Sequence, residues 1–147
     1  MANYTGNSFK YKLLTAGINF SSNTFKARLM ASGYVFNRLT HKKWADVSAS
    51  ELAGINGYTT GGVSLSGVAV TESDTYNKCT VTWNDPTWVA SGGNIGPSAG
   101  LMIVDDTDSD KCIVQYMPFS PEQTQPSGGT FTGHNVAFNQ IDADTAI

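Results

Sequence analysis

The chain has 147 residues, which is enough for one domain with a hydrophobic core and short for two. Hydrophobic residues make up 40% of it and charged residues only 14%, so neutral polar residues must cover much of the surface. No run of roughly 18 apolar residues is present to span a membrane, and the polar start is not followed by the apolar core of a secretory signal. We therefore expect no membrane partner, and synthesis and folding in a cytoplasm.

Charge is segregated along the chain, although the net charge is only −3. All seven basic residues among the first 43 occur without a single Asp or Glu, whereas the remainder carries all twelve acids and only two lysines. One interpretation is two ordinary solvated faces. The other is a basic end that docks on an acidic partner, with an acidic end that keeps copies apart. Nucleic acid is the poorer partner, because the basic residues fall on different predicted elements and the total is acidic.

The N-terminal segment is expected to begin with an extended arm over residues 1–8. A short helix follows over residues 9–16, with Ser8 as its cap and Gly17 as its stop. A strand is the alternative for the same residues.

Residues 25–29 alternate apolar side chains with Lys26 and Arg28, which predicts a half-exposed strand whose basic side faces outward. Residues 34–62 then lose the alternation and predict a long connection, with one helical turn near residues 47–52. Ordered connections of this length often carry a contact surface. This one contains His41, Lys42, Lys43 and Trp44.

In the middle of the chain, residues 63–70 change the phase of their alternation at Gly67, which predicts a β-bulge. Residues 79–83 alternate again, with Cys79, Val81 and Trp83 on the inner face. A short extended piece is expected over residues 88–90.

The chain is organised around residues 98–119, where apolar runs at 101–104 and 112–117 flank a polar tip at 105–110. This is the pattern of a β-hairpin with a solvated loop. The first run shows no alternation, which indicates a strand buried on both faces and therefore central in its sheet.

After the hairpin, a polar loop is expected over residues 120–129, a last strand over 130–138 and a polar arm over 139–147. The expected core contacts of the last strand are Phe131, Val136 and Phe138. The residues expected to end the preceding strand are Pro118 and Pro121. Regularly spaced short strands with Gly-rich turns predict one mainly β domain over residues 1–147, a β-sandwich or barrel with a short N-terminal helix.

The acidic tip resembles a calcium loop only in part. Asp106, Asp108 and Asp110 match the first three ligand positions of an EF-hand, but Lys111 stands where that loop needs Gly and Met117 where it needs Glu. We therefore interpret the tip as a solvated turn and expect no metal.

The other reactive side chains show no catalytic or metal-binding spacing. His41 and His134 lack further ligands near them, and each is expected to be a surface or loop histidine. Cys79 and Cys112 fall on predicted strands and are candidates for neighbours in one sheet, and buried reduced thiols are favoured over a disulfide. We expect no enzymatic activity and no cofactor.

Tryptophans offer one possible ligand surface. Trp83 is in phase with core residues, whereas Trp44 and Trp88 are candidates for stacking against carbohydrate if they are exposed.

Several segments, taken together in their order, resemble a family of small structural proteins of tailed bacteriophages. They are residues 9–30, 51–71, 81–88, 99–106 and 127–132. The resemblance implies a non-enzymatic virion component, in particular a capsid decoration (cement) protein on the outer capsid surface, assembled in the host bacterial cytoplasm. It also implies homotrimers at symmetry axes that bridge subunits of the major capsid protein.

If the chain decorates a capsid, its basic side is expected to meet the acidic capsid surface while the 105–110 tip points outward. The candidate contact residues are Lys26, Arg28, Lys42, Lys43 and Trp44. The alternative is a tail or head-fibre adhesin that binds host surface carbohydrate through Trp44 or Trp88.

Overall fold

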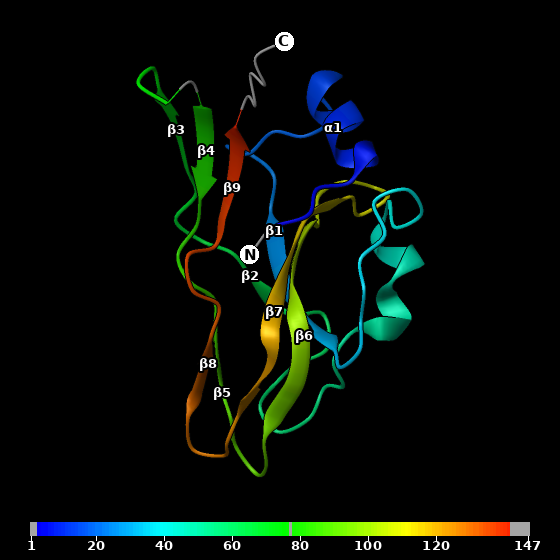
Figure 1. The fold of residues 1–147 in the computed structure, drawn as a ribbon, viewed down its shortest axis with the longest axis vertical. Coiled ribbons are helices and arrows are strands. Elements are labelled where there is room, and N and C mark those ends of the chain that lie inside the picture. Colours follow the sequence, from blue (N-terminus) through cyan, green and yellow to red (C-terminus); the bar gives the residue numbers. More distant parts are fainter. Residues whose placement is uncertain (1–2, 77, 142–147) are drawn as a thin grey trace.

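The computed structural model describes residues 3–76 and 78–141, and these form a mainly β domain, as predicted (Figure 1). The helical elements are α1 (Asn7–Leu14), η1 (Trp44–Asp46) and η2 (Ser48–Ser50). The strands are β1 (Phe25–Ala31), β2 (Val63–Ser64), β3 (Ala69–Ser73), β4 (Lys78–Thr82), β5 (Thr87–Val89), β6 (Ile95–Asp105), β7 (Ile113–Gln125), β8 (Thr130–Thr132) and β9 (Ala137–Ile141). No helix in the described ranges is long and apolar enough to cross a membrane.

The strands form three antiparallel sheets. The largest has the order β2-β1-β6-β7, and the two smaller ones are β3-β4-β9 and β5-β8. In Figure 1 the smaller sheets lie along one side of the large sheet, and the chain between β1 and β2 lies along the other. The large sheet is therefore the middle layer of the molecule.

Strand β6 is buried on both faces, as its unbroken apolar run predicts. Leu101 and Ile103 belong to the main core, which lies between the large sheet and the smaller sheets. Met102 and Val104 belong to a second core on the opposite face. Because each face has its own covering layer, the strand has no polar side to show in its sequence.

Residues 32–62, called here the connection, cover the second core with their part up to Val47, whereas Leu52 and Tyr58 pack in the main core. Its side chains Tyr34, Phe36, Trp44 and Val47 pack on the sheet. Its backbone is tied to the sheet where Leu52 N–H donates to Leu29 O (2.8 Å). The prediction of a long connection with some helix is confirmed, with two short 3₁₀ helices in place of one turn.

Helix α1 begins and ends earlier than predicted, and Ser8 is not its cap. The N-cap is Gly6, which has no side chain to accept a hydrogen bond from the first turn of the helix. Phe9 is fully buried and lies 5.0 Å from the ring of Phe138, whereas Leu14 is 85% exposed. Packing of Phe9 into the main core therefore sets the position of the helix more than capping does.

The predicted bulge at Gly67 is wrong, because the phase change marks a switch between sheets. Strand β2 pairs with β1 in the large sheet, whereas β3 pairs with β4 in a smaller one. Gly67 has φ of +64°, and a Cβ there would lie 2.5 Å from the side-chain nitrogen Nδ2 of Asn84. The crossing thus needs glycine for its backbone conformation and for space.

The C-terminal third differs from prediction in two ways. Strand β7 continues through Pro118 and Pro121 to Gln125, where a loop was expected. It is tolerant of proline because it is an edge strand of the large sheet, and beyond Tyr116 its outer side forms no backbone hydrogen bond with another described residue. The single strand expected over residues 130–138 is instead β8 and β9, which join different sheets. Its predicted core contacts, Phe131, Val136 and Phe138, are all buried.

The two expected arms are partly within the domain. Tyr4 pairs with Tyr116 by two backbone hydrogen bonds of 2.8 and 2.9 Å. At the other end β9 runs to Ile141, and residues 1–2 and 142–147 lie outside the described residues.

The cysteines are free and far from equivalent. Cys79 is exposed on β4, whereas Cys112 is buried beside β7 in the large sheet. The expectation that they adjoin in one sheet is wrong, and the expectation that both thiols are buried is confirmed only for Cys112. That burial raises the pKa of the Cys112 thiol to about 11.

Candidate functional site

The connection carries an exposed surface that combines two of the predicted contact residues, Lys42 and Lys43, with residues that the sequence did not single out. Val35 and Leu39 are 78% and 70% exposed, although both are large apolar side chains. Arg38, Lys42 and Lys43 are exposed on the same segment. We call these five residues the docking strip. None of its three cations forms an ion pair with another residue of the described chain.

The backbone under the docking strip is held in place. Asp46 Oδ2 accepts hydrogen bonds from the N–H groups of Lys42 (2.9 Å) and Lys43 (3.0 Å), and these bonds lower the pKa of Asp46. Trp44 N–H donates to Lys111 O at 2.9 Å. The two lysines are thus presented from a fixed backbone, which reduces the entropy lost on binding a partner.

A shallow hollow of about 480 Å³ borders the strip and includes Leu39, Lys42 and Lys43 in its lining. Lys12 of α1 and Asp110 line it too. Leu39 and the two lysines therefore share one concave surface, which Asp46 also lines, whereas Val35 borders a separate hollow.

Trp44 is the anchor of the connection rather than an exposed ring. Its indole is half-buried, and the guanidinium carbon of Arg28 lies 4.1 Å from the ring centroid. Such a stacked cation covers one face of the indole. Trp44 therefore has little free surface for a sugar.

Arg28 does not lie on an outward basic side, contrary to the sequence-based expectation. Its side chain is 7% exposed, and Nη1 lies 3.6 Å from Glu51 Oε2. Asp106 lies 3.8 Å from Nη2 and also 3.4 Å from Lys26 Nζ. Both candidate contact residues on β1 thus have carboxylate partners within the chain, which leaves Lys42 and Lys43 as the freer cations.

The tip between β6 and β7 is not the solvated acidic turn that was expected. Asp105 is fully buried, and it accepts hydrogen bonds from Asn23 Nδ2 (2.7 Å) and from the N–H of Thr107 (3.0 Å). Lys111 Nζ lies 2.7 Å from Asp106 Oδ1, and Lys12 Nζ lies 2.6 Å from Asp108 Oδ2. Most of the acidic charge is neutralised locally, by Lys111 next to the tip and by Lys12, which is distant in sequence.

The remaining candidate residues from the sequence are Trp88, His41 and His134. Trp88 is buried against Tyr58 and Phe131, so its prediction as an exposed sugar platform is wrong. His41 Nδ1 lies 3.0 Å from Tyr34 Oη, and His134 is exposed. No group of three His, Cys, Asp or Glu side chains within the described ranges is arranged to hold a metal ion.

Sequence reasoning missed Val35, Arg38 and Leu39. The signal was present, since residues 34–43 carry apolar and basic side chains with no acid among them. A loop prediction hides such a signal, because exposure along an irregular segment has no period.

Comparison with known proteins adds no relative: no family model, no curated protein and no solved structure matches the chain.

Proposed function

We propose that this chain is a non-enzymatic structural component of a tailed-bacteriophage virion, namely a capsid decoration protein that binds the major capsid protein through the docking strip. The observation that supports the proposal most is the strip itself, in which Val35 and Leu39 accompany three cations without carboxylate partners in the described chain. Apolar area supplies affinity on burial, and unpaired cations select an acidic partner surface.

The fold is suited to a mechanical role. The strip lies on a connection packed over the large sheet, so a load at the strip passes to the sheet through Trp44 and Val47. Self-association as a trimer at a symmetry axis would multiply the contact area between neighbouring capsid subunits. The resemblance of the sequence segments to phage structural proteins agrees with this role.

The test is cosedimentation of the purified chain with heads of its own virus that lack this component. We expect saturable binding at a stoichiometry set by a symmetry axis. Absence of binding to bare heads would overturn the decoration role and transfer the proposal to the tail or fibre.

The strip is tested with charge-reversed variants in the same assay. Lys43→Glu should weaken binding by about tenfold and reduce its salt dependence, because a favourable charge contact becomes a repulsive one. Lys78→Glu changes the net charge equally but lies on β4, in a smaller sheet on the other side of the large sheet (Figure 1). Equal effects of the two variants would contradict the assignment of the docking strip.

A further inference from the structure

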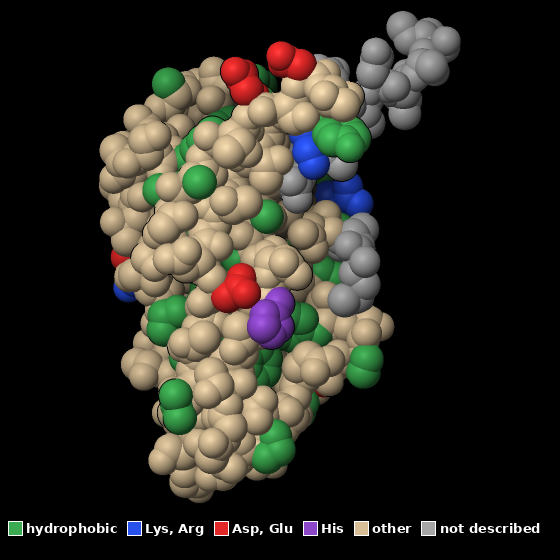
Figure 2. Space-filling view, turned by 90° about the vertical axis from the view of Figure 1, so that its left-hand side faces the viewer, with side chains coloured by type: hydrophobic (Ala, Val, Ile, Leu, Met, Phe, Trp, Pro, Cys, Tyr) green, Lys and Arg blue, Asp and Glu red, His purple; other side chains and the backbone are tan. Residues whose placement is uncertain are grey.

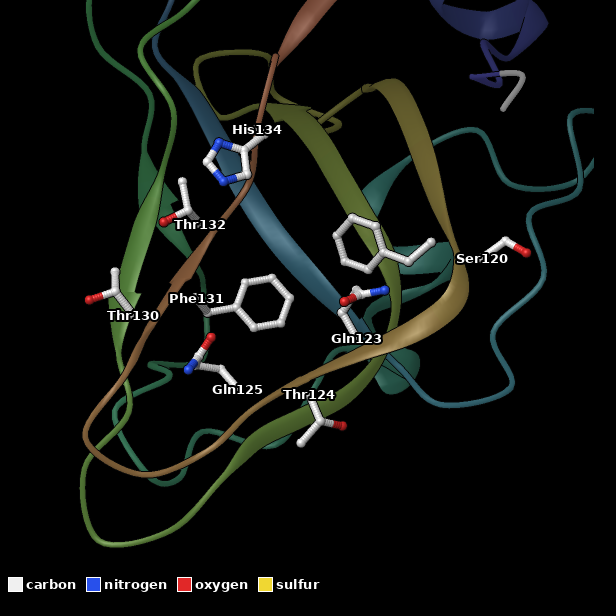
Figure 3. Close-up of a pocket in the computed structure, with 9 residues that line it drawn as sticks. Ser120, Gln123, Thr124, Gln125, Thr130, Phe131, Thr132 and His134 are labelled. Carbon is white, nitrogen blue, oxygen red and sulfur yellow. The ribbon is translucent and has the colours of Figure 1, made fainter.

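A second hollow lies between the latter half of β7 and β8, and it has a different chemistry from the docking strip (Figure 3). Its volume is about 420 Å³, which is within the range of small-molecule sites. In Figure 3, Phe131 projects from β8 toward the β7 side, where Gln123 lies. The hollow exists because β7 continues past its prolines to Gln125 instead of ending in a loop.

The lining combines an aromatic floor with neutral polar groups. The rings of Phe119 and Phe131 lie 5.9 Å apart, and Phe119 is only partly buried. The remaining lining side chains are hydroxyls, amides and one imidazole, with no Lys, Arg, Asp or Glu among the lining residues. Figure 2 shows that the surrounding face is mostly uncharged.

Several of these polar groups are available to a ligand. The side-chain amide of Gln125 makes no hydrogen bond to another residue of the described chain and lies beside Phe131, whereas Thr130 and Thr132 project from the opposite side of β8 (Figure 3). Gln123 uses one N–H to donate to Pro121 O (2.8 Å), and its carbonyl oxygen accepts no bond from a described residue. Amide groups can both donate and accept, so they match a ligand rich in hydroxyls.

The imidazole at the rim is oriented by a carboxylate. His134 Nδ1 lies 3.2 Å from Asp85 Oδ2, and Asp85 Oδ1 accepts a hydrogen bond from Asn135 N–H at 2.9 Å. With Nδ1 engaged by Asp85, Nε2 remains for a ligand hydroxyl.

We infer that this hollow binds a neutral saccharide. A sugar ring has an apolar C–H face that fits an aromatic floor and a rim of hydroxyls that fits the amides of Gln123 and Gln125 and an imidazole. A phosphorylated ligand would need cations that the lining lacks, and a purely apolar ligand would leave the amides unpaired. The inference does not rest on the decoration role, so either proposal can fail alone.

The test is an NMR titration of the ¹⁵N-labelled full chain with neutral methyl glycosides of glucose, galactose, mannose and N-acetylglucosamine, and separately with N-acetylneuraminic acid. Probe concentrations on the order of 10 mM detect dissociation constants in the millimolar range. We expect saturable shifts from at least one neutral probe, confined to amides of residues 119–125 and 130–134. Shifts elsewhere, shifts from the acidic probe of equal size, or no shifts from any neutral probe would overturn the inference.

Matched variants separate the site from the fold. Gln125→Leu and Gln123→Leu remove polar groups that face Phe131 in the hollow and should each weaken binding by about tenfold, while thermal unfolding stays close to that of the original chain. Thr71→Val removes an exposed hydroxyl from β3 and should leave binding unchanged. Equal binding by all three variants would also overturn the inference.

Discussion

Lys12 Nζ lies 2.6 Å from Asp108 Oδ2, and this ion pair joins helix α1 to the loop between β6 and β7. Burial disfavours the charged ammonium, but the hydrogen bond and charge of Asp108 outweigh it and raise the pKa of Lys12. Asp108 Oδ2 also accepts a hydrogen bond from Cys112 N–H at 3.0 Å. One carboxylate therefore holds both the helix and the start of β7.

Replacement of this carboxylate should loosen the helix. Asp108 is 11% exposed, and we expect Asp108→Asn to lower the free energy of unfolding in urea by about 1–3 kcal/mol. Asp110 also contacts Lys12, at 3.4 Å, but is 59% exposed, so Asp110→Asn should leave stability almost unchanged. Similar losses in the two variants would show that the short ion pair is not what holds α1.

Stability should fall in acid partly through Asp106. The hydrogen bond from Lys111 outweighs burial and, with the charges of Lys26 and Lys111, lowers the pKa of Asp106 below its ordinary value of 3.8. A carboxyl with a lower pKa in the folded state stabilises the fold above its unfolded pKa, and this contribution is lost as the pH falls through the folded pKa. Urea unfolding across a pH series should therefore show a shallower acid decline for Asp106→Asn. Glu72→Gln, on the exposed strand β3, is the control and should follow the original chain.

The buried pair of Arg28 and Glu51 should behave as a unit. Glu51 accepts hydrogen bonds from Tyr58 Oη (2.8 Å) and from Gly61 N–H (2.7 Å), and its side chain is 6% exposed. Arg28→Met leaves this carboxylate without its nearest cation, and we expect a cost of about 3–5 kcal/mol in the free energy of unfolding. In the double variant with Glu51→Gln, part of that cost should be recovered. Simple addition of the two single effects would argue against coupling.

The two thiols should differ in reactivity with a thiol-specific disulfide reagent at mildly alkaline pH. Cys79 is exposed and should react at once, whereas Cys112 should react only as the chain unfolds, because it is buried and its pKa is about 11. Labelling followed by mass spectrometry identifies which thiol reacts. Rapid labelling at Cys112 in the native chain would mean that the start of β7 opens readily.

Local sequence determined which segments are buried. The run at 101–104 predicts a strand covered on both faces, and alternation predicts the core side chains Phe25, Leu29 and Phe131. These predictions succeed because an apolar side chain at a regular position marks a buried face, but a polar phase does not mark an exposed one, since Arg28 on β1 is buried too.

Tertiary structure alone decided which partner covers each face. The phase change at Gly67 is a switch between sheets, and Pro118 lies within an edge strand instead of ending it. A period of two identifies a buried face but carries no information on sheet membership, which depends on pairings between residues distant in sequence.

The tertiary structure also decided which charged side chains pair with one another. The sequence determines that basic residues precede the acids, and folding brings Lys12 to Asp108, Lys26 to Asp106 and Arg28 to Glu51. Charge along a chain reveals neither pairing nor burial, because Coulomb energy depends on separation in space and on solvent exposure. Only the folded chain therefore distinguishes cations with an internal partner from Lys42 and Lys43, which face outward on the docking strip.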